Sequence, residues 1–230
     1  MTRGEARAYS ENLGRLLEGA VSPGELVLAP PFTALDAVRD PQDRWSLAGQ
    51  NAAAEREGAF TGEVSAAMLA DAGCRYALVG HSERRRIFGE GEELLAKKLS
   101  RVREAGLTPI YCVGETAEER AAGRTPEVLE RQAATLRGDP IGAPLVLAYE
   151  PVWAIGSGTP ATPADAGEAR ALLARLLSSR TDLTILYGGS VTPENARELL
   201  DISGVDGFLV GGASLKPAAF AAIVGIRPSP

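Results

Sequence analysis

The chain has 230 residues, of which 45% are hydrophobic, and a formal net charge of −6. This length suits one large domain with a sizeable core, and an acidic balance without a basic stripe argues against a nucleic-acid partner. No apolar run approaches the roughly 18 residues of a membrane span and no signal-peptide pattern opens the chain, so we expect a cytoplasmic protein without a membrane partner. Two cysteines are too few for a disulfide framework, and no Cys/His spacing predicts a metal site.

The chain opens with a helix-period pattern at 2–19 that no strand precedes, and strand-like and helix-like segments then alternate to the end. The predicted strands are 25–30, 45–50, 75–81, 108–114, 144–150, 184–190 and 206–212. Clear helical patterns lie at 63–73, 92–106, 126–136 and 163–177, with Pro163 and Pro193 marking helix starts and Gly73 and Gly106 marking helix ends. Since no linker interrupts this alternation, residues 1–230 are predicted to form a single α/β domain with a parallel sheet covered by helices.

The count of elements leaves two architectures open. Seven strands accompany eight helical segments, whereas a closed (β/α)₈ barrel has eight strands, each before its helix. A doubly wound open sheet could also hold seven strands. In both architectures the functional residues gather at the carboxyl ends of the strands.

Two of these strand ends carry candidate acid–base residues. His81, the only histidine, follows an apolar strand and precedes a possible helix start at "SERR", where Ser82 could cap the helix. A helix start disfavours imidazolium, so we expect a neutral, hydrogen-bond-donating ring. Glu150 ends another apolar strand and precedes "PVWAIGSGTPATP", which has the composition of a lid. A lone histidine or glutamate is more often a packed or solvated side chain, but a covered carboxylate facing a neutral ring suits proton abstraction beside a carbonyl.

Paired glycines follow the last two predicted strands, in "YGGSVTPEN" and "LVGGASLK". Glycine lets the backbone approach a ligand closely, and N–H groups at a helix start point at anions. Each pair could equally be a tight turn. Two such pairs on consecutive strands match the phosphate site that barrels build from the loops after their last two strands.

Five segments, read together and in order, resemble the triosephosphate isomerase family: "VGHSERRRIFGE", "YCVGET", "AYEPVWAIGSG", "YGGSVTPEN" and "DGFLVGGASLK". The resemblance extends through "LAPPFTAL" and "QNAAAEREGAFTGEVSAAML", so it covers nearly the whole chain. It implies a (β/α)₈ TIM barrel that interconverts dihydroxyacetone phosphate and D-glyceraldehyde 3-phosphate through an enediolate, in glycolysis and gluconeogenesis, without a cofactor or metal.

The resemblance also implies roles for individual residues. Glu150 would be the base and His81 the neutral electrophile, a pairing carried over from the family, for which it is known. Further implied roles are phosphate binding by Gly156, Ser190, Gly211 and Gly212, support of the site by Glu83 and Cys112, and insertion of a loop at 51–65, with Thr61 near its tip, into the partner of a homodimer. For Glu83 and Cys112, a purely structural role as an ion-pair partner or a buried strand residue is about as well supported.

The sequence departs from the family in two places. The family begins with a strand ending in Asn-x-Lys, whose lysine contacts the substrate, whereas this chain starts at "MTRGEARAYS" and its three lysines, Lys97, Lys98 and Lys216, lie at unsuitable positions. We therefore expect the native polypeptide to begin upstream of Met1 and to include this first strand. In the lid, Pro160 stands where the second hinge is expected, so we predict that Pro160→Thr alters turnover more than phosphate affinity.

Two other functions compete with the isomerase. One is a catalytically impaired phosphate-binding or interaction protein, because the first strand and its lysine are absent from the sequence. The other is a different phosphosugar barrel enzyme, which does not account for "GHSERR" and "AYEPVWAIG" occurring together.

Overall fold

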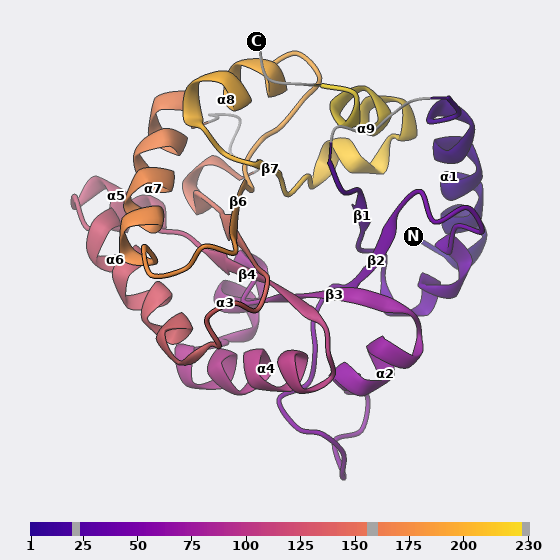
Figure 1. The fold of residues 1–230 in the computed structure, drawn as a ribbon, viewed down its shortest axis with the longest axis horizontal. Helices are drawn as coiled ribbons and strands as arrows, with labels where there is room; N and C mark the ends of the chain where they lie inside the picture. Colours follow the sequence, from indigo (N-terminus) through magenta and orange to yellow (C-terminus); the bar gives the residue numbers. More distant parts are fainter. Residues whose placement is uncertain (20–23, 156–160, 227–230) are drawn as a thin grey trace.

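The computed structural model describes residues 1–19, 24–155 and 161–226. Within them, seven parallel strands form one sheet (Figure 1). The strands are β1 (Val27–Leu28), β2 (Ser46–Gly49), β3 (Cys74–Val79), β4 (Thr108–Val113), β5 (Leu145–Tyr149), β6 (Leu183–Tyr187) and β7 (Gly207–Phe208). The α-helices are α1 (Arg3–Leu16), α2 (Ala66–Asp71), α3 (Ser82–Phe88), α4 (Glu92–Glu104), α5 (Ala117–Ala121), α6 (Thr125–Ala133), α7 (Pro163–Leu176), α8 (Ala196–Ser203) and α9 (Pro217–Val224).

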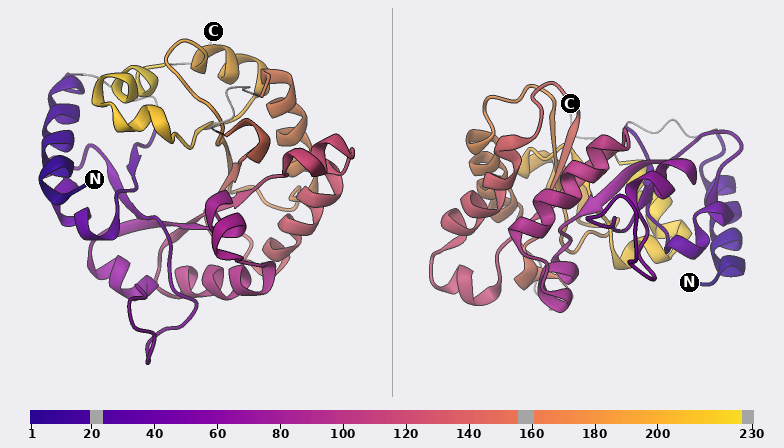
Figure 2. Two further views of the ribbon diagram at one scale, coloured as in Figure 1. Left: turned by 180° about the vertical axis from the view of Figure 1, so that it is seen from behind. Right: turned by 90° about the horizontal axis from the view of Figure 1, so that it is seen from below.

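The strand order decides between the two architectures left open by the sequence. The strands lie in chain order from β1 to β7 without a reversal, whereas a doubly wound sheet reverses its order at a switch point. The sheet curls, and the helices surround its outer face as a ring, which Figure 2 shows from behind and from below. In this ring α1 packs against α9, while in the described part of the chain β1 and β7 each pair with one strand only. The described residues therefore form a TIM barrel that lacks one strand, as predicted.

Two apolar clusters hold the sheet. The larger lies between the strands and the helices and includes Leu13, Leu95, Leu129 and Leu173, all fully buried. The smaller fills the inside of the curled sheet with Ala48, Leu78, Ile110, Cys112 and Ala148. This arrangement explains why the strands read as continuous apolar runs, because their side chains are buried on both faces.

Helix ends largely follow the sequence signals. Thr2 caps α1 in a reciprocal arrangement with Glu5, and Thr162 caps α7 with Asp165 in the same way. The expected helix start at Pro193 is displaced. The amide N–H of Thr192 donates to Asn195 Oδ1, and this turn delays α8 until Ala196. None of the helices in the described ranges is both long and apolar enough to cross a bilayer.

A buried ionic clamp holds the amino-terminal end of the sheet. Arg103, at the end of α4, donates to both carboxylate oxygens of Asp139 at 2.8 and 2.6 Å. Arg180, before β6, approaches the same carboxylate at 3.1 Å and also donates to the carbonyl of Ala143. The side chains of Asp139 and Arg180 are only 1% and 2% exposed. The clamp thus ties α4, the segment before β5 and the segment before β6 together, at the end opposite to the candidate active site.

Candidate active site

The register of the sheet places the carboxyl ends of its central strands at one edge. Val79 of β3 pairs with Tyr111 of β4, and Tyr149 of β5 pairs with both Val113 and Tyr187 in the neighbouring strands. The residues that follow these strands therefore leave the sheet side by side. They include His81 after β3, Gly114 and Glu115 after β4, Glu150 after β5, and Gly188 after β6.

Glu150 and His81 meet at this edge. Oε1 of Glu150 lies 3.0 Å from Nε2 of His81, and Oε2 accepts a hydrogen bond of 2.8 Å from the backbone N–H of Ser82. The carboxylate is 3% exposed and the imidazole 28% exposed. A buried carboxylate is tolerated only with such partners, and here both come from the start of α3.

His81 itself caps α3, so the expectation that Ser82 caps this helix is wrong. Nδ1 of His81 accepts a hydrogen bond of 3.3 Å from the backbone N–H of Glu83, because the imidazole of the residue before the helix reaches back to its first turn. An accepting Nδ1 requires a lone pair, so the neutral ring carries its hydrogen on Nε2. That hydrogen points at Glu150.

The pKa of His81 is raised above its ordinary value in this arrangement. Burial lowers it, but the hydrogen bond from His81 to Glu150, the charge of Glu150 and that of Glu83 together outweigh burial. The argument from the helix start alone predicted the opposite direction, since it did not include a carboxylate in contact with the ring. The neutral donor is therefore the form present above this raised pKa.

Close packing fixes Glu150 on the sheet side. A side chain on Gly114 would overlap the carbonyl oxygen of Glu150, and one on Gly188 would lie 2.9 Å from its Cγ. Cys112, on β4, is fully buried, and burial together with the charge of Glu150 raises the pKa of its thiol well above the ordinary value. Cys112 is thus an inert neighbour of the carboxylate rather than a nucleophile.

The segment after Glu150 is anchored at its stem. Glu115 is fully buried and accepts hydrogen bonds from Trp153 Nε1 at 2.8 Å and from the hydroxyl of Tyr149 at 3.1 Å. Ser190 Oγ donates to the carbonyl of Ala154 at 3.3 Å, so the loop after β6 also holds this stem. Gly156 and Pro160 lie outside the described residues.

The two glycine pairs differ in their surroundings. Packing explains why residues 188 and 189 are glycines. A side chain on Gly188 would approach Cγ of Glu150, and one on Gly189 would overlap the Tyr187 hydroxyl. Gly211 and Gly212, at the start of the 3₁₀ turn Gly212–Leu215, face open space: an added Cβ would meet no atom within 4 Å. Gly211 and Gly212 are both exposed, whereas Gly188 is buried and Gly189 is partly buried.

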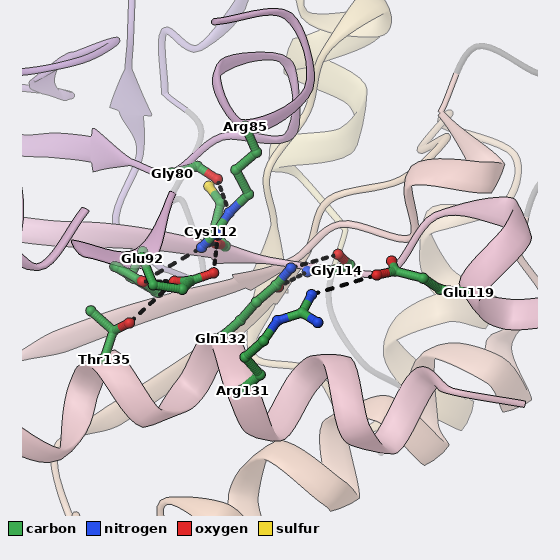
Figure 3. A network of polar contacts seen from close by, with 10 residues as sticks. Gly80, Arg85, Glu92, Cys112, Gly114, Glu119, Arg131, Gln132 and Thr135 are labelled. Carbon is green, nitrogen blue, oxygen red and sulfur yellow. Dashed lines mark hydrogen bonds and ion pairs between the residues drawn. The ribbon is translucent and has the colours of Figure 1, made fainter. Parts of the chain in front are cut away.

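A cavity of about 250 Å³ adjoins Glu150 on its helix side, and its lining includes Arg85, Gly114 and Gln132. Gly211 and Gly212 are not among the described residues that line it. Figure 3 shows how the polar side chains lie here: Gln132 pairs with both the N–H and the carbonyl of Gly114. Sequence reasoning missed Arg85 and Gln132, which stand inside helical patterns, and it named Glu115 only as a residue at a strand end.

Two further predicted site residues, Glu83 and Thr61, are exposed. Glu83 is exposed, with a carboxylate oxygen 3.9 Å from Nδ1 of His81. Thr61 lies on an exposed turn of the loop that projects beside α2 (Figure 1).

Comparison with known proteins places this chain in a family. The family model for triosephosphate isomerase matches residues 1–227. The chain belongs to the triosephosphate isomerase family. It is 47% identical over 236 residues to the triosephosphate isomerase of Nitratidesulfovibrio vulgaris (strain Miyazaki F), covering 97% of this chain and 94% of that protein. It is also 47% identical to the enzyme of Roseiflexus sp. (strain RS-1) over 99% of this chain and 93% of that protein, and 46% identical to that of Thermus thermophilus over 98% and 94%.

Membership of the triosephosphate isomerase family excludes the other phosphosugar barrel enzyme considered from the sequence, because the match extends over nearly the whole chain. It also agrees with the strand order, since the family fold is the TIM barrel. The family is one of isomerases, so its chemistry is the transfer of atoms within one molecule.

Proposed function

We propose that this protein interconverts dihydroxyacetone phosphate and D-glyceraldehyde 3-phosphate, as a step of glycolysis and gluconeogenesis in the cytoplasm. The observation that carries the proposal is the meeting of a buried carboxylate and a hydrogen-bond-donating imidazole: Glu150 Oε1 lies 3.0 Å from His81 Nε2. Each half of the reaction moves a proton between one substrate carbon and the carboxylate, and such acid–base chemistry requires no cofactor and no metal.

Glu150 acts as the base. Its carboxylate takes a proton from the carbon beside the substrate carbonyl and returns it to the adjacent carbon. The Nε2–H of His81 gives its proton to the carbonyl oxygen and the ring takes a proton back from the neighbouring hydroxyl, so one proton also moves between the two oxygens. A positioned base of this kind contributes about 10²–10⁴-fold to a rate. Glu150 contacts Nε2 of His81 and accepts a hydrogen bond from the N–H of Ser82, so the substrate must replace these contacts before proton transfer.

Backbone N–H groups hold the phosphate. Gly211 and Gly212 offer accessible backbone at the start of a 3₁₀ turn, and the strands β6 and β7 that precede Ser190 and Gly211 are neighbours in the sheet. N–H groups at such a turn favour an anion without a positively charged side chain. Gly156 supplies a further N–H from the lid.

By resemblance to the family, the lid segment that follows Glu150 protects the enediolate from water. The described part of this segment is held to Glu115 through Trp153 and to Ser190 through Ala154. Glu83 and Cys112 support the site by setting the charge near Nδ1 of His81 and by filling the space beside Glu150.

The protein works as a homodimer, with the loop containing Thr61 as the contact. This loop projects from the barrel (Figure 1) and carries Phe60, which is 47% exposed, while Met68 on the following α2 is 59% exposed. Large exposed apolar side chains on a projecting loop suit burial against a second copy.

A coupled isomerase assay tests the proposal, with Glu150→Gln as the key variant. Glutamine keeps the shape of the side chain but is no base, so kcat should fall by about 10²–10⁴-fold. Calorimetry with a phosphorylated enediolate analogue should show that both forms bind it. Analogue binding by the unaltered protein without any turnover would refute the isomerase and leave a phosphate-binding protein.

A further inference from the structure

We propose that Arg85 is a positioning residue for His81: its guanidinium holds the carboxyl ends of β3 and β4 together and thereby fixes the imidazole against the substrate carbonyl. This inference rests on the proposed function. Arg85 lies in the middle of α3, the short helix that His81 caps, and its side chain is 15% exposed.

The guanidinium contacts the backbone of both strand ends. Nε of Arg85 donates to the carbonyl of Gly80 at 2.8 Å, and Nη2 donates to the carbonyl of Cys112 at 3.0 Å. Figure 3 shows the side chain reaching down from α3 to these two carbonyls. The β3–β4 ladder ends at the pair Val79 and Tyr111, so Arg85 joins the two strands where their own pairing stops.

Gly80 is the point at which this bridge acts on the site. It directly precedes His81 and has a φ of +75°, a left-handed conformation that glycine adopts readily. A side chain on Gly80 would approach Arg85 Nη2 to 3.1 Å and Leu95 to 3.0 Å. The backbone that aims the imidazole is therefore packed directly against the guanidinium.

A second set of contacts fixes the guanidinium itself. Nη1 donates to Glu92 Oε1 at 2.6 Å, and the other carboxylate oxygen of Glu92 accepts from the hydroxyls of Tyr111 and Thr135, each at 3.1 Å. Glu92 thus neutralises Arg85 and sets its plane. Only a planar fork can reach the two carbonyls and the carboxylate together, so lysine cannot replace arginine here.

Proton transfer tolerates little misplacement of the reacting groups, so loss of the Arg85 contacts should slow catalysis. An error of about 1 Å in a reacting group can cost about 10²-fold in rate. In Arg85→Lys one ammonium replaces three directed contacts, and the strand ends become free to move relative to each other. The imidazole should then lose its single orientation, while the distant phosphate site keeps its affinity.

The kinetic test compares Arg85→Lys with Arg103→Lys. Arg103 also forms a two-pronged contact, but with Asp139 at the opposite end of the sheet, so its variant controls for lost stability. We expect Arg85→Lys to lower kcat by about 10–100-fold, with KM changed less than about 3-fold. Arg103→Lys should leave kcat unchanged. Equal kcat values for the two variants, or a loss confined to KM, would overturn the proposal.

Nitrogen NMR measures which ring nitrogen of His81 carries the hydrogen. This tautomer would not change if Arg85 only stabilised the fold. His81 is the only histidine, so ¹⁵N-labelled histidine reports one imidazole. The unaltered protein should show the neutral ring with hydrogen on Nε2, and Arg85→Lys should show a mixture of both neutral tautomers. An unchanged tautomer in Arg85→Lys contradicts the proposal. This comparison needs no turnover, so it separates failure of this proposal from failure of the isomerase function.

If Arg85→Lys does not fold, Glu92→Gln replaces it. Glutamine removes the charge that sets the guanidinium plane but leaves the two carbonyl contacts, so the same tautomer change should appear with a smaller fall in kcat. An unchanged tautomer and an unchanged kcat in Glu92→Gln would then overturn the proposal.

Discussion

A side-chain carbon on Gly188 would lie 2.9 Å from Cγ of Glu150. Gly188 belongs to the loop after β6, and its backbone N–H donates to the carbonyl of Tyr149, the residue before Glu150. The first glycine of the pair therefore forms one wall of the space that holds the carboxylate. The wall on the other side is Gly114, whose missing side chain makes room for the carbonyl of Glu150.

Gly188→Ala should lower activity without unfolding the protein. The added methyl group pushes on Glu150 Cγ, and displacement of the carboxylate by even part of an ångström should reduce kcat by about 10–100-fold. Steady-state kinetics with thermal unfolding as a companion measurement checks this. Gly138→Ala is the matched control, because a side chain there would meet no atom within 4 Å. Equal activities in the two variants would contradict the packing role of Gly188.

The pH dependence of the reaction should reflect His81. Glu150 raises the pKa of His81 above the ordinary value of 6.5, and only the neutral ring can act as proposed. We therefore expect kcat/KM to rise with pH and to level off above this raised pKa, measured between about pH 5 and 8. If kcat/KM falls only below about pH 6, protonation of His81 is not what limits the activity of the free enzyme.

The same pKa affects stability in a defined direction. Because the folded protein raises the pKa of His81, the ring stabilises the fold fully at pH values below its ordinary pKa, and this contribution is lost as the pH rises through the raised value. The difference in unfolding free energy between the unaltered protein and His81→Gln should therefore shrink with increasing pH. Urea unfolding at several pH values measures it, and a difference that grows with pH would contradict the assignment.

The clamp around Asp139 should govern stability but not catalysis. Asp139→Asn removes the buried counter-charge of Arg103 and leaves Arg180 with Asp182 as its remaining carboxylate, so the free energy of unfolding should fall by about 3–5 kcal/mol. Urea denaturation checks the value. Glu130→Gln is the control, since Glu130 pairs with Arg137 on the exposed surface and should change stability by less than about 1 kcal/mol. A loss of kcat in folded Asp139→Asn would show that the two ends of the barrel are coupled.

Phe60→Asp should weaken the proposed dimer. A charge on this exposed loop position resists burial against a second copy. Sedimentation should then report a mass moving from twice 24.0 kDa towards 24.0 kDa. Ile141→Asp, which alters a more exposed apolar side chain on a different loop, should leave the mass unchanged. A monomeric unaltered protein, or equal effects of both substitutions, would refute the role of the loop.

Much of the fold was predictable from local patterns. All seven predicted strands are present, with shorter bounds at both ends of the sheet, because strands buried on both faces need continuous apolar runs. The capping residues Thr2 and Thr162 mark α1 and α7 because they form hydrogen bonds within a few residues of sequence. The short helix α5 escaped prediction, since it has five residues and no buried face. Helix α8 begins three residues after Pro193, because Asn195 closes a turn with Thr192 before the helix.

The sequence by itself determined which candidate residues stand at which strand ends, because apolar periodicity and the positions of glycine and proline are local properties. Only the tertiary structure decided what those residues do to each other. Ser82 and Glu150 form a hydrogen bond across 68 positions of sequence, and Arg85 joins two strands from within a helix. The direction of the His81 pKa shift and the packing of Gly188 arise from the same convergence. Hydrogen bonds, charge effects and steric contacts act over a few ångströms of space, and no local pattern in a chain records which distant residues share that space.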